Sequence, residues 1–294
     1  MKKIVTHNGT FHPDDVCAVA TLKMAFPNEE FIIVRTRDPK EFQDADFVLD
    51  VSKLYDGLKY FDHHQLEGAG KRDNGIPYAS FGLVWKKFGI NVCNTELICD
   101  AIDKKIVQVV DAGDNGVNIY NEIYEGVSPF GLTSVIASFN PTALESREED
   151  KCFVDAVKFA IFVLERAIAF EKVSEEAQKV FEYVYNNSED KRVLVFDRDL
   201  DWKFYNGSRN GHGFDEVLYI VYPSDDRWSV RAMHKDPKKF ETKKPFPEVW
   251  AGLSDEELEK VSGVTGAVFC HRARFLVVAK TKEAALSLAS KALL

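Results

Sequence analysis

Residues 3–15 read Lys3-Ile4-Val5-Thr6-His7-Asn8-Gly9-Thr10-Phe11-His12-Pro13-Asp14-Asp15. The pattern predicts a short β-strand over residues 3–6, followed by a polar loop that carries two histidines and two aspartates. A helix is predicted over residues 16–25, and Pro27 ends it. A strand that leads through such a loop into a helix is typical of an α/β fold, in which strand ends can aim several ligands at one point.

The rest of the first 120 residues continues this alternation of strand and helix patterns. Strands are predicted over residues 31–35, 47–51 and 59–61, and helices over residues 80–88 and 95–110. Apolar runs without polar alternation indicate a parallel sheet that is covered on both faces. We therefore expect the α/β class, with a mostly parallel sheet in the amino-terminal domain.

The second half predicts linking helices and then a smaller α/β domain. Apolar residues between 146 and about 187 fit one long helix or a broken pair, and Asn186-Asn187-Ser188 ends it. Strands and one final helix are then predicted over residues 193–196, 217–222, 228–233, 266–269, 275–279 and, for the helix, 282–292. We expect a metal-binding catalytic domain over residues 1–187, linking helices included, and a substrate-binding domain over residues 188–294.

Composition limits the classes of function. The chain has 294 residues and a net charge of -9, which argues against a broad surface that coats nucleic acid but permits a short basic groove. Five cysteines without a Cys-x-x-Cys pair favour reduced structural thiols. Because no signal-peptide or membrane-spanning pattern is found, we expect a soluble, cytoplasmic protein without a membrane partner. Its oligomeric state stays open, a homodimer included.

The first loop offers metal ligands. His7 and His12 are five residues apart and Asp14 and Asp15 follow, so a tight glycine-bearing loop can bring rings and a carboxylate together. The alternative is that Asp14 or Asp15 only caps the helix. Asp50 closes an apolar strand, where a buried carboxylate needs a metal or cation, although a turn residue is the alternative.

Two further clusters add ligands. In Asp62-His63-His64, one ring can reach a metal and the next a substrate oxygen, while Asp62 orients its neighbour. Asp111 and Asp114 lie in a turn-rich segment whose alternative interpretation is an Asx turn. Together the four places suit two divalent ions, manganese foremost, with magnesium or cobalt as alternatives. Paired metals of this kind typically serve phosphoester hydrolysis.

At these residues the chain resembles the DHH phosphoesterase superfamily, named for the motif at residues 62–64. It resembles more closely the melanocyte-proliferating-gene family of metal-dependent hydrolases and exonucleases. The matching stretches are residues 6–12, 35–39, 60–65, 111–116, 202–203, 228–230, 245–250 and 261–263. The resemblance implies a manganese-dependent phosphoesterase with two domains. Its implied metal ligands are His7, His12, Asp14, Asp50, His63 and Asp111, with Asp50 as the bridge.

The resemblance also implies roles around the phosphate. His64 would face the scissile phosphate as acid or charge stabiliser. One departure is His12, which stands where the superfamily has an aspartate, so the identity of the ion stays open. The predicted catalytic residues are His64, Asp62 and Arg37, and the predicted substrate-binding residues are Arg35, Lys203, His271, Arg272 and Arg274.

Alternatives exist for several of these cations. Arg35 and Arg37 could hold a second phosphate or balance the carboxylates. His271, with Arg272 and Arg274, could grip a phosphate as a fork of donors, or the segment is an exposed basic loop. The multi-glycine stretch of the superfamily is absent from this loop.

The sequence is compatible with three functions. The leading hypothesis is a two-metal phosphodiesterase of the 3′–5′ exonuclease type that acts on single-stranded RNA or short oligonucleotides. The second keeps the metals and changes the substrate to a small phosphate ester, pyrophosphate, a dinucleotide or a nucleotide. The third is a metal- or nucleotide-binding module without turnover.

Overall fold

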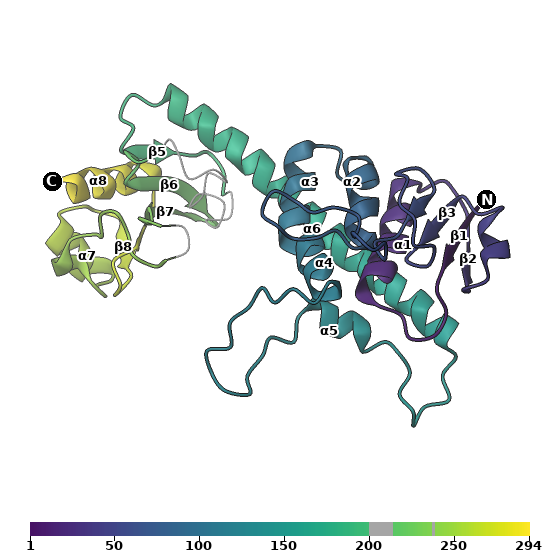
Figure 1. Cartoon of the computed structure of the whole chain (residues 1–294). Coiled ribbons are helices and arrows are strands. Elements are labelled where there is room, and N and C mark those ends of the chain that lie inside the picture. Colours follow the sequence, from purple (N-terminus) through teal and green to yellow (C-terminus); the bar gives the residue numbers. More distant parts are fainter. Residues whose placement is uncertain (200–213, 237–238) are drawn as a thin grey trace. The chain divides into compact units, whose positions relative to one another are not determined.

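The structure is a computed structural model in which residues 1–199, 214–236 and 239–294 are described. It divides the chain into two compact units, Met1–Lys172 and Val173–Leu294. The long helix α6 (Glu149–Asn187) contributes to both units (Figure 1). The predicted domain boundary at residue 187 is the end of this helix, and the functional division there stays a prediction.

The first unit is built on a parallel sheet, as the sequence predicted. Its four strands run in the order β2-β1-β3-β4, and every neighbouring pair is parallel. They are β1 (Lys2–Thr6), β2 (Phe31–Arg35), β3 (Phe47–Leu49) and β4 (Tyr60–Phe61). Because parallel strands end at the same edge of a sheet, the loops that follow these four strands share one edge.

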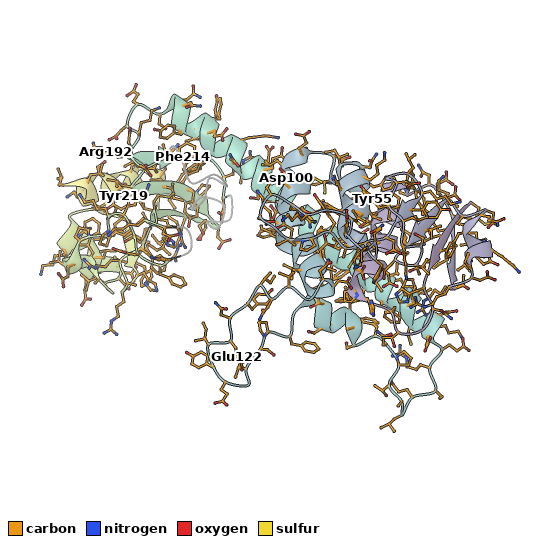
Figure 2. The ribbon with its side chains drawn as sticks, in the orientation of Figure 1. Tyr55, Asp100, Glu122, Arg192, Phe214 and Tyr219 are labelled. Carbon is orange, nitrogen blue, oxygen red and sulfur yellow. The ribbon has the colours of Figure 1, made fainter. Side chains whose placement is uncertain are left out.

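Helices complete the first unit and bury its apolar core. They are α1 (Pro13–Ala25), α2 (Ser80–Cys93), α3 (Glu96–Ile102), α4 (Gln108–Asp114), α5 (Leu132–Ala137), the 3₁₀ helix η1 (Pro39–Phe42) and the π-helical turn η2 (Asp103–Val107). The core includes Phe11, Leu22, Phe61 and Phe81, and Phe153 joins it from α6. The segment between α4 and α5, which carries Glu122, extends away from these helices (Figure 2).

The second unit contains a five-stranded sheet in the order β5-β6-β7-β9-β8. Only β5 and β6 are parallel, and the other pairs are antiparallel. Its elements are β5 (Val193–Val195), β6 (Tyr219–Ser224), β7 (Arg227–Ala232), η4 (Glu248–Trp250), α7 (Asp255–Ser262), β8 (Ala267–Cys270), β9 (Leu276–Ala279) and α8 (Lys282–Leu293). The predicted hairpin is confirmed, with Asp225 and Asp226 between the paired residues Ser224 and Arg227.

Several predicted boundaries differ from the structure. Helix α1 begins at Pro13 rather than residue 16, because proline is well suited to the first helical position. The single helix predicted over residues 95–110 is divided into α3, η2 and α4, and it continues to Asp114. Among the described residues, none of the helices combines the length and apolarity needed to cross a membrane.

Candidate metal centre

The shared edge of the first sheet gathers acids and histidines from elements far apart in the sequence. Their ligand atoms form three overlapping groups, each with its atoms within 4.8 Å of one another. The members, which we name the acid–histidine cluster, are His7, His12, Asp14, Asp50, Asp62, His63, His64 and Asp114. Asp50 belongs to two groups and His12 to two groups, so the groups form one continuous site.

The strand ends place the first members. His7 directly follows β1, and its Nε2 atom lies 3.4 Å from a carboxylate oxygen of Asp50, which directly follows β3. The backbone of Asp50 has a φ of 52°, in the left-handed region that a non-glycine residue enters at a cost of about 1–3 kcal/mol. This sharp turn ends the strand and coincides with the centre of the cluster.

The loop between β1 and α1 is held by long-range contacts. Both backbone polar groups of Phe11 bond to the amide of Asn140, at 3.0 and 2.9 Å. The Arg35 guanidinium donates to the carbonyl of Gly9 and packs on the ring of Phe153, with 4.9 Å to the centroid. These contacts fix the loop that carries His12.

The start of α1 supplies two buried carboxylates with different surroundings. Asp15 accepts from the backbone of His12 at 3.0 Å and from Thr6 Oγ1 at 3.4 Å, so the predicted capping role fits Asp15. Asp14 is fully buried, and neither of its oxygens has a hydrogen-bond partner in the described part of the chain. Burial, together with the charges of Asp50 and Asp114, raises the pKa of Asp14 well above its usual value.

The histidines of the Asp62-His63-His64 motif take separate partners. His63 Nε2 lies 3.0 Å from Asp114 Oδ2, and His63 Nδ1 lies 3.6 Å from Asp50 Oδ1. His64 Nδ1 lies 2.8 Å from Asp62 and 3.3 Å from Asp50. The hydrogen bond to Asp50 is the largest of the effects that raise the pKa of His64 to about 9.

Asp50 connects the two sides of the cluster. Its Oδ2 atom faces His7, while its Oδ1 atom faces His63 and His64 and accepts from Ser80 Oγ at 3.1 Å. Burial opposes ionisation, but the surrounding histidines outweigh it and hold the pKa of Asp50 well below its usual range. A carboxylate with each oxygen turned to different ligands is placed to bridge two cations.

The donor set fits divalent cations. The His7 Nε2 and His63 Nδ1 atoms are buried and, like both oxygens of Asp14, satisfy no hydrogen bond within the described residues. Buried polar groups are normally satisfied, and buried acids normally pair with cations or coordinate metals. Mixed imidazole and carboxylate donors suit manganese, zinc or iron. A divalent cation at this position would satisfy these unpaired atoms.

Asp111 lies outside this cluster, contrary to the sequence prediction. Its Oδ2 atom pairs with Arg72 at 2.8 Å, and its Oδ1 atom accepts from the backbone of Gly82 at 2.9 Å. Burial outweighs Arg72 and raises the pKa of Asp111 to about 7. Asp114, one helical turn later on α4, lies in the cluster instead, and the helical spacing was the signal that could have found it.

Arg35 and Arg37 have different surroundings. The Arg35 side chain is 2% exposed, pairs with Asp150 at 2.9 Å and donates to the carbonyl of Gly9, so it supports the loop, and its predicted role toward substrate stays a prediction. Arg37 is exposed and lines a small cavity of about 140 Å³ at the cluster. The role predicted for Arg37 at the site stays open to test.

The predicted substrate-binding residues of the second unit are described by their own surroundings. The His271 ring packs on Phe275 with 4.3 Å between centroids, and its Nδ1 atom accepts from the backbone of Ala273. Arg274 donates to the carbonyl of Phe246 at 3.3 Å, and Arg272 is exposed. Lys203 lies outside the described residues. Their roles toward substrate stay predictions.

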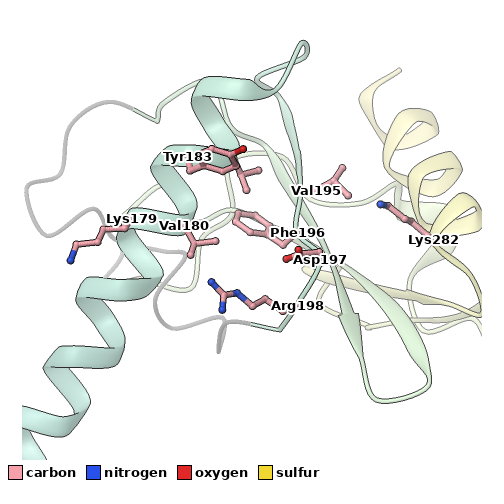
Figure 3. Close-up of a pocket in the computed structure, with 9 residues that line it drawn as sticks. Lys179, Val180, Tyr183, Val195, Phe196, Asp197, Arg198 and Lys282 are labelled. Atoms are coloured by element: carbon pink, nitrogen blue, oxygen red, sulfur yellow. The ribbon is translucent and has the colours of Figure 1, made fainter.

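A larger pocket, of about 630 Å³, lies within the second unit between α6, the segment after β5 and the start of α8 (Figure 3). Two of its cations already have acidic partners, Lys179 with Glu175 at 3.0 Å and Arg198 with Glu176 at 3.9 Å. Its lining contains only one metal-ligating side chain among the described residues, that of Asp197. The smaller cavity at the cluster is therefore the better candidate for chemistry.

Comparison with known protein families identifies relatives of the whole chain. The model described as "Uncharacterised protein family (UPF0160)", which bears the name MYG1 exonuclease, matches residues 3–293. The chain belongs to this family. The melanocyte-proliferating-gene family expected from the sequence is thereby confirmed.

Relatives match over nearly the whole chain. An MYG1 protein of Schizosaccharomyces pombe is 30% identical over 327 residues, covering 99% of this chain and 97% of its own. An MYG1 protein of Chlamydia pneumoniae is 32% identical, covering 96% and 93%. The human protein named MYG1 exonuclease is 28% identical, covering 98% and 84%.

A solved structure gives a weaker likeness. RecJ of Thermus thermophilus in complex with Mn²⁺ is 12% identical and has a TM-score of 0.29. The alignment covers 99% of this chain and 52% of the RecJ chain, so the chain spans about half the length of that protein.

Proposed function

We propose that this protein is a divalent-metal-dependent phosphodiesterase that removes nucleotides from an end of single-stranded RNA or short oligonucleotides. The observation that carries the proposal is Asp14, a fully buried carboxylate with two unsatisfied oxygens beside other acids and histidines. Because such a carboxylate is costly unless a cation balances it, its place is best explained by a metal.

The residues that would hold two ions are His7, His12, Asp14, Asp50, His63 and Asp114. Manganese is the ion we favour, with magnesium or cobalt as alternatives, since the donors mix nitrogen and oxygen. Such ions supply activation of water and neutralisation of the charge on phosphoryl oxygens. Asp50 would be shared, because its two oxygens face different histidines.

The chain's own groups orient the remaining chemistry. Asp62 accepts from the backbone of Lys53 at 2.6 Å and of His64 at 2.9 Å, which fixes the carboxylate. Asp62 in turn engages Nδ1 of His64 at 2.8 Å, leaving Nε2 as the ring nitrogen available to substrate. His64 is half-exposed and lines the cavity, so it can donate a proton or a hydrogen bond to a phosphate oxygen.

The family supports the choice of polymer. The human relative is named an exonuclease, and we extend this to the 3′–5′ class of activity on RNA. A second candidate is hydrolysis of a small phosphate compound, which is favoured by the net charge of -9, since an acidic protein repels a long polyanion.

The test uses purified protein with Mn²⁺ and 5′-labelled single-stranded RNA, an unphosphorylated dinucleotide and pyrophosphate. We expect a ladder of progressively shortened labelled RNA. Immediate release of labelled mononucleotide would contradict the 3′–5′ polarity, and hydrolysis of pyrophosphate alone would favour the second candidate.

Two matched variants distinguish the loss of a cluster residue from the loss of an exposed acid. Asp114→Ala should abolish release, whereas Asp100→Ala, an exposed acid on the neighbouring helix α3 (Figure 2), should not change it. If no substrate is cleaved with Mn²⁺, Mg²⁺ or Co²⁺, the proposed function is wrong.

A further inference from the structure

Two cations flank the acid–histidine cluster at the shared edge of the first sheet. Arg37 follows β2, and Lys53 follows β3. In the sheet, β2 and β3 are the neighbours of β1 on its two sides, and His7 follows β1. Both cations line the same cavity of about 140 Å³ with His7, His12 and His64.

The side chains of Arg37 and Lys53 have no polar partner in the described part of the protein. Within residues 1–199, 214–236 and 239–294, neither the Arg37 guanidinium nor the Lys53 ammonium makes a hydrogen bond or an ion pair. Surface cations often lack partners, but these two line a cavity that contains two buried aspartates.

The aspartates of the cavity are engaged by other groups. Asp50 contacts three histidines and Ser80. Asp62 accepts from two backbone N–H groups and lies against His64. Among the described residues neither carboxylate forms an ion pair with Arg37 or Lys53, which leaves both cations available to an external anion.

The cavity's size limits that anion. Ligand pockets that enclose a whole small molecule measure roughly 300–1,000 Å³, and this cavity has about 140 Å³. A phosphate group fits, whereas a complete nucleotide does not, so the sugar and base would stay outside. Planar guanidinium and compact ammonium groups are the usual partners of phosphate oxygens.

We propose that Arg37 and Lys53 form a subsite for a second phosphate of the substrate, next to the phosphate that is cleaved. The inference rests on the proposed phosphodiesterase function and deepens it, since it selects substrates with two or more phosphates over single-phosphate esters. Charge contacts to neighbouring phosphates position a nucleic acid without reading its sequence. The subsite would therefore favour oligonucleotides of any sequence.

The backbone conformation of Lys53 allows a glycine substitution that leaves the loop unchanged. Lys53 has a φ of 58°, which glycine adopts without steric cost. Its N–H still donates to Asp62, and a Lys53→Gly variant keeps this donor. The variant therefore removes the ammonium group while preserving the loop, and Lys53→Arg restores the charge.

The experiment compares three dinucleotides in Mn²⁺: one with only the internal phosphodiester, one with an added 5′-phosphate and one with an added 3′-phosphate. We expect one of the added phosphates to raise kcat/KM of the wild type about tenfold, as for one charged contact. Lys53→Gly should lose this preference, Lys53→Arg should regain it, and Lys87→Met, an exposed lysine on α2, should retain it. No preference in the wild type, or an equal loss on all three dinucleotides in Lys53→Gly, would overturn the subsite.

A binding measurement separates this inference from the proposed function. Calorimetry uses the same dinucleotides with a methylphosphonate linkage, which carries no charge and is not expected to be hydrolysed. An affinity gain of about tenfold from the terminal phosphate, lost in Lys53→Gly, supports the subsite even if no phosphodiester is cleaved. Equal affinities of the two proteins would refute the subsite whether or not turnover occurs.

Discussion

Asp14→Asn is predicted to make the metal-free protein more stable and the manganese-loaded protein less stable than the wild type. The wild-type carboxylate is fully buried and has no hydrogen-bond partner among the residues the structure describes. An unsatisfied buried polar group costs about 1–3 kcal/mol, and a charge costs more. The isosteric amide removes the charge and its repulsion from Asp50 and Asp114.

The expected changes in stability are large enough to be measured by thermal unfolding. A gain of about 2 kcal/mol without metal corresponds to a rise of roughly 4–8 °C in Tm for a unit of 150–250 residues. Manganese at 1,000 times its Kd should stabilise the wild type by about 4.1 kcal/mol, and the variant should lose most of that increment. The order of the two melting temperatures should therefore reverse between EDTA and Mn²⁺.

Asp15→Asn is the matched control, because Asp15 is equally buried one residue later but has hydrogen-bond donors. Burial raises the pKa of Asp15 to about 7, and the Asn amide keeps an oxygen that can accept the same bonds, so Asp15→Asn should gain the same Tm increment from Mn²⁺ as the wild type. If Asp14→Asn melts below the wild type in EDTA, or gains the full increment from Mn²⁺, the assignment of Asp14 as a ligand is wrong.

Three further predictions concern α4 and its neighbours. Arg72→Met should cost about 3–5 kcal/mol in urea unfolding, because it leaves the buried Asp111 without its ion pair; a loss below about 1 kcal/mol would contradict this role. Asp111→Asn should lower the stability and retain the Mn²⁺ affinity, whereas Asp114→Ala should lower the Mn²⁺ affinity and retain the stability. Calorimetric titrations measure the affinities, and equal affinities of the two variants would refute the distinction. Gly82→Ala should cost about 3 kcal/mol in chemical unfolding, since its Cβ would meet Asp111 Oδ2 at 1.8 Å; wild-type stability would show that the helix can shift.

The strand pattern predicted the site because parallel strands end together. His7, Asp50 and His63 each follow a short apolar strand, and the structure brings all three to one edge. The strand pattern therefore placed at one sheet edge candidate ligands that are more than fifty positions apart.

The surroundings of Asp111 and Arg35 could not be predicted from the sequence, because they depend on non-local contacts. Asp111 and Asp114 have similar local sequences, and Asp111 is engaged elsewhere by Arg72, which is 39 positions away, and by the backbone of Gly82. Arg35 ends a strand at the correct edge, yet the rings of Phe11 and Phe153 cover it. No local pattern reports such partners, because they depend on how α6, the loop after β1 and the segment before α2 pack.

The central claim is that the six proposed ligands hold two metal ions on either side of Asp50. Anomalous diffraction at the manganese edge, from crystals grown with Mn²⁺, tests it directly. The account predicts two peaks in contact with Asp50, with His7 and His12 among the ligands of one ion and Asp14, His63 and Asp114 among those of the other. Peaks elsewhere, or no peak at saturating Mn²⁺, would contradict it.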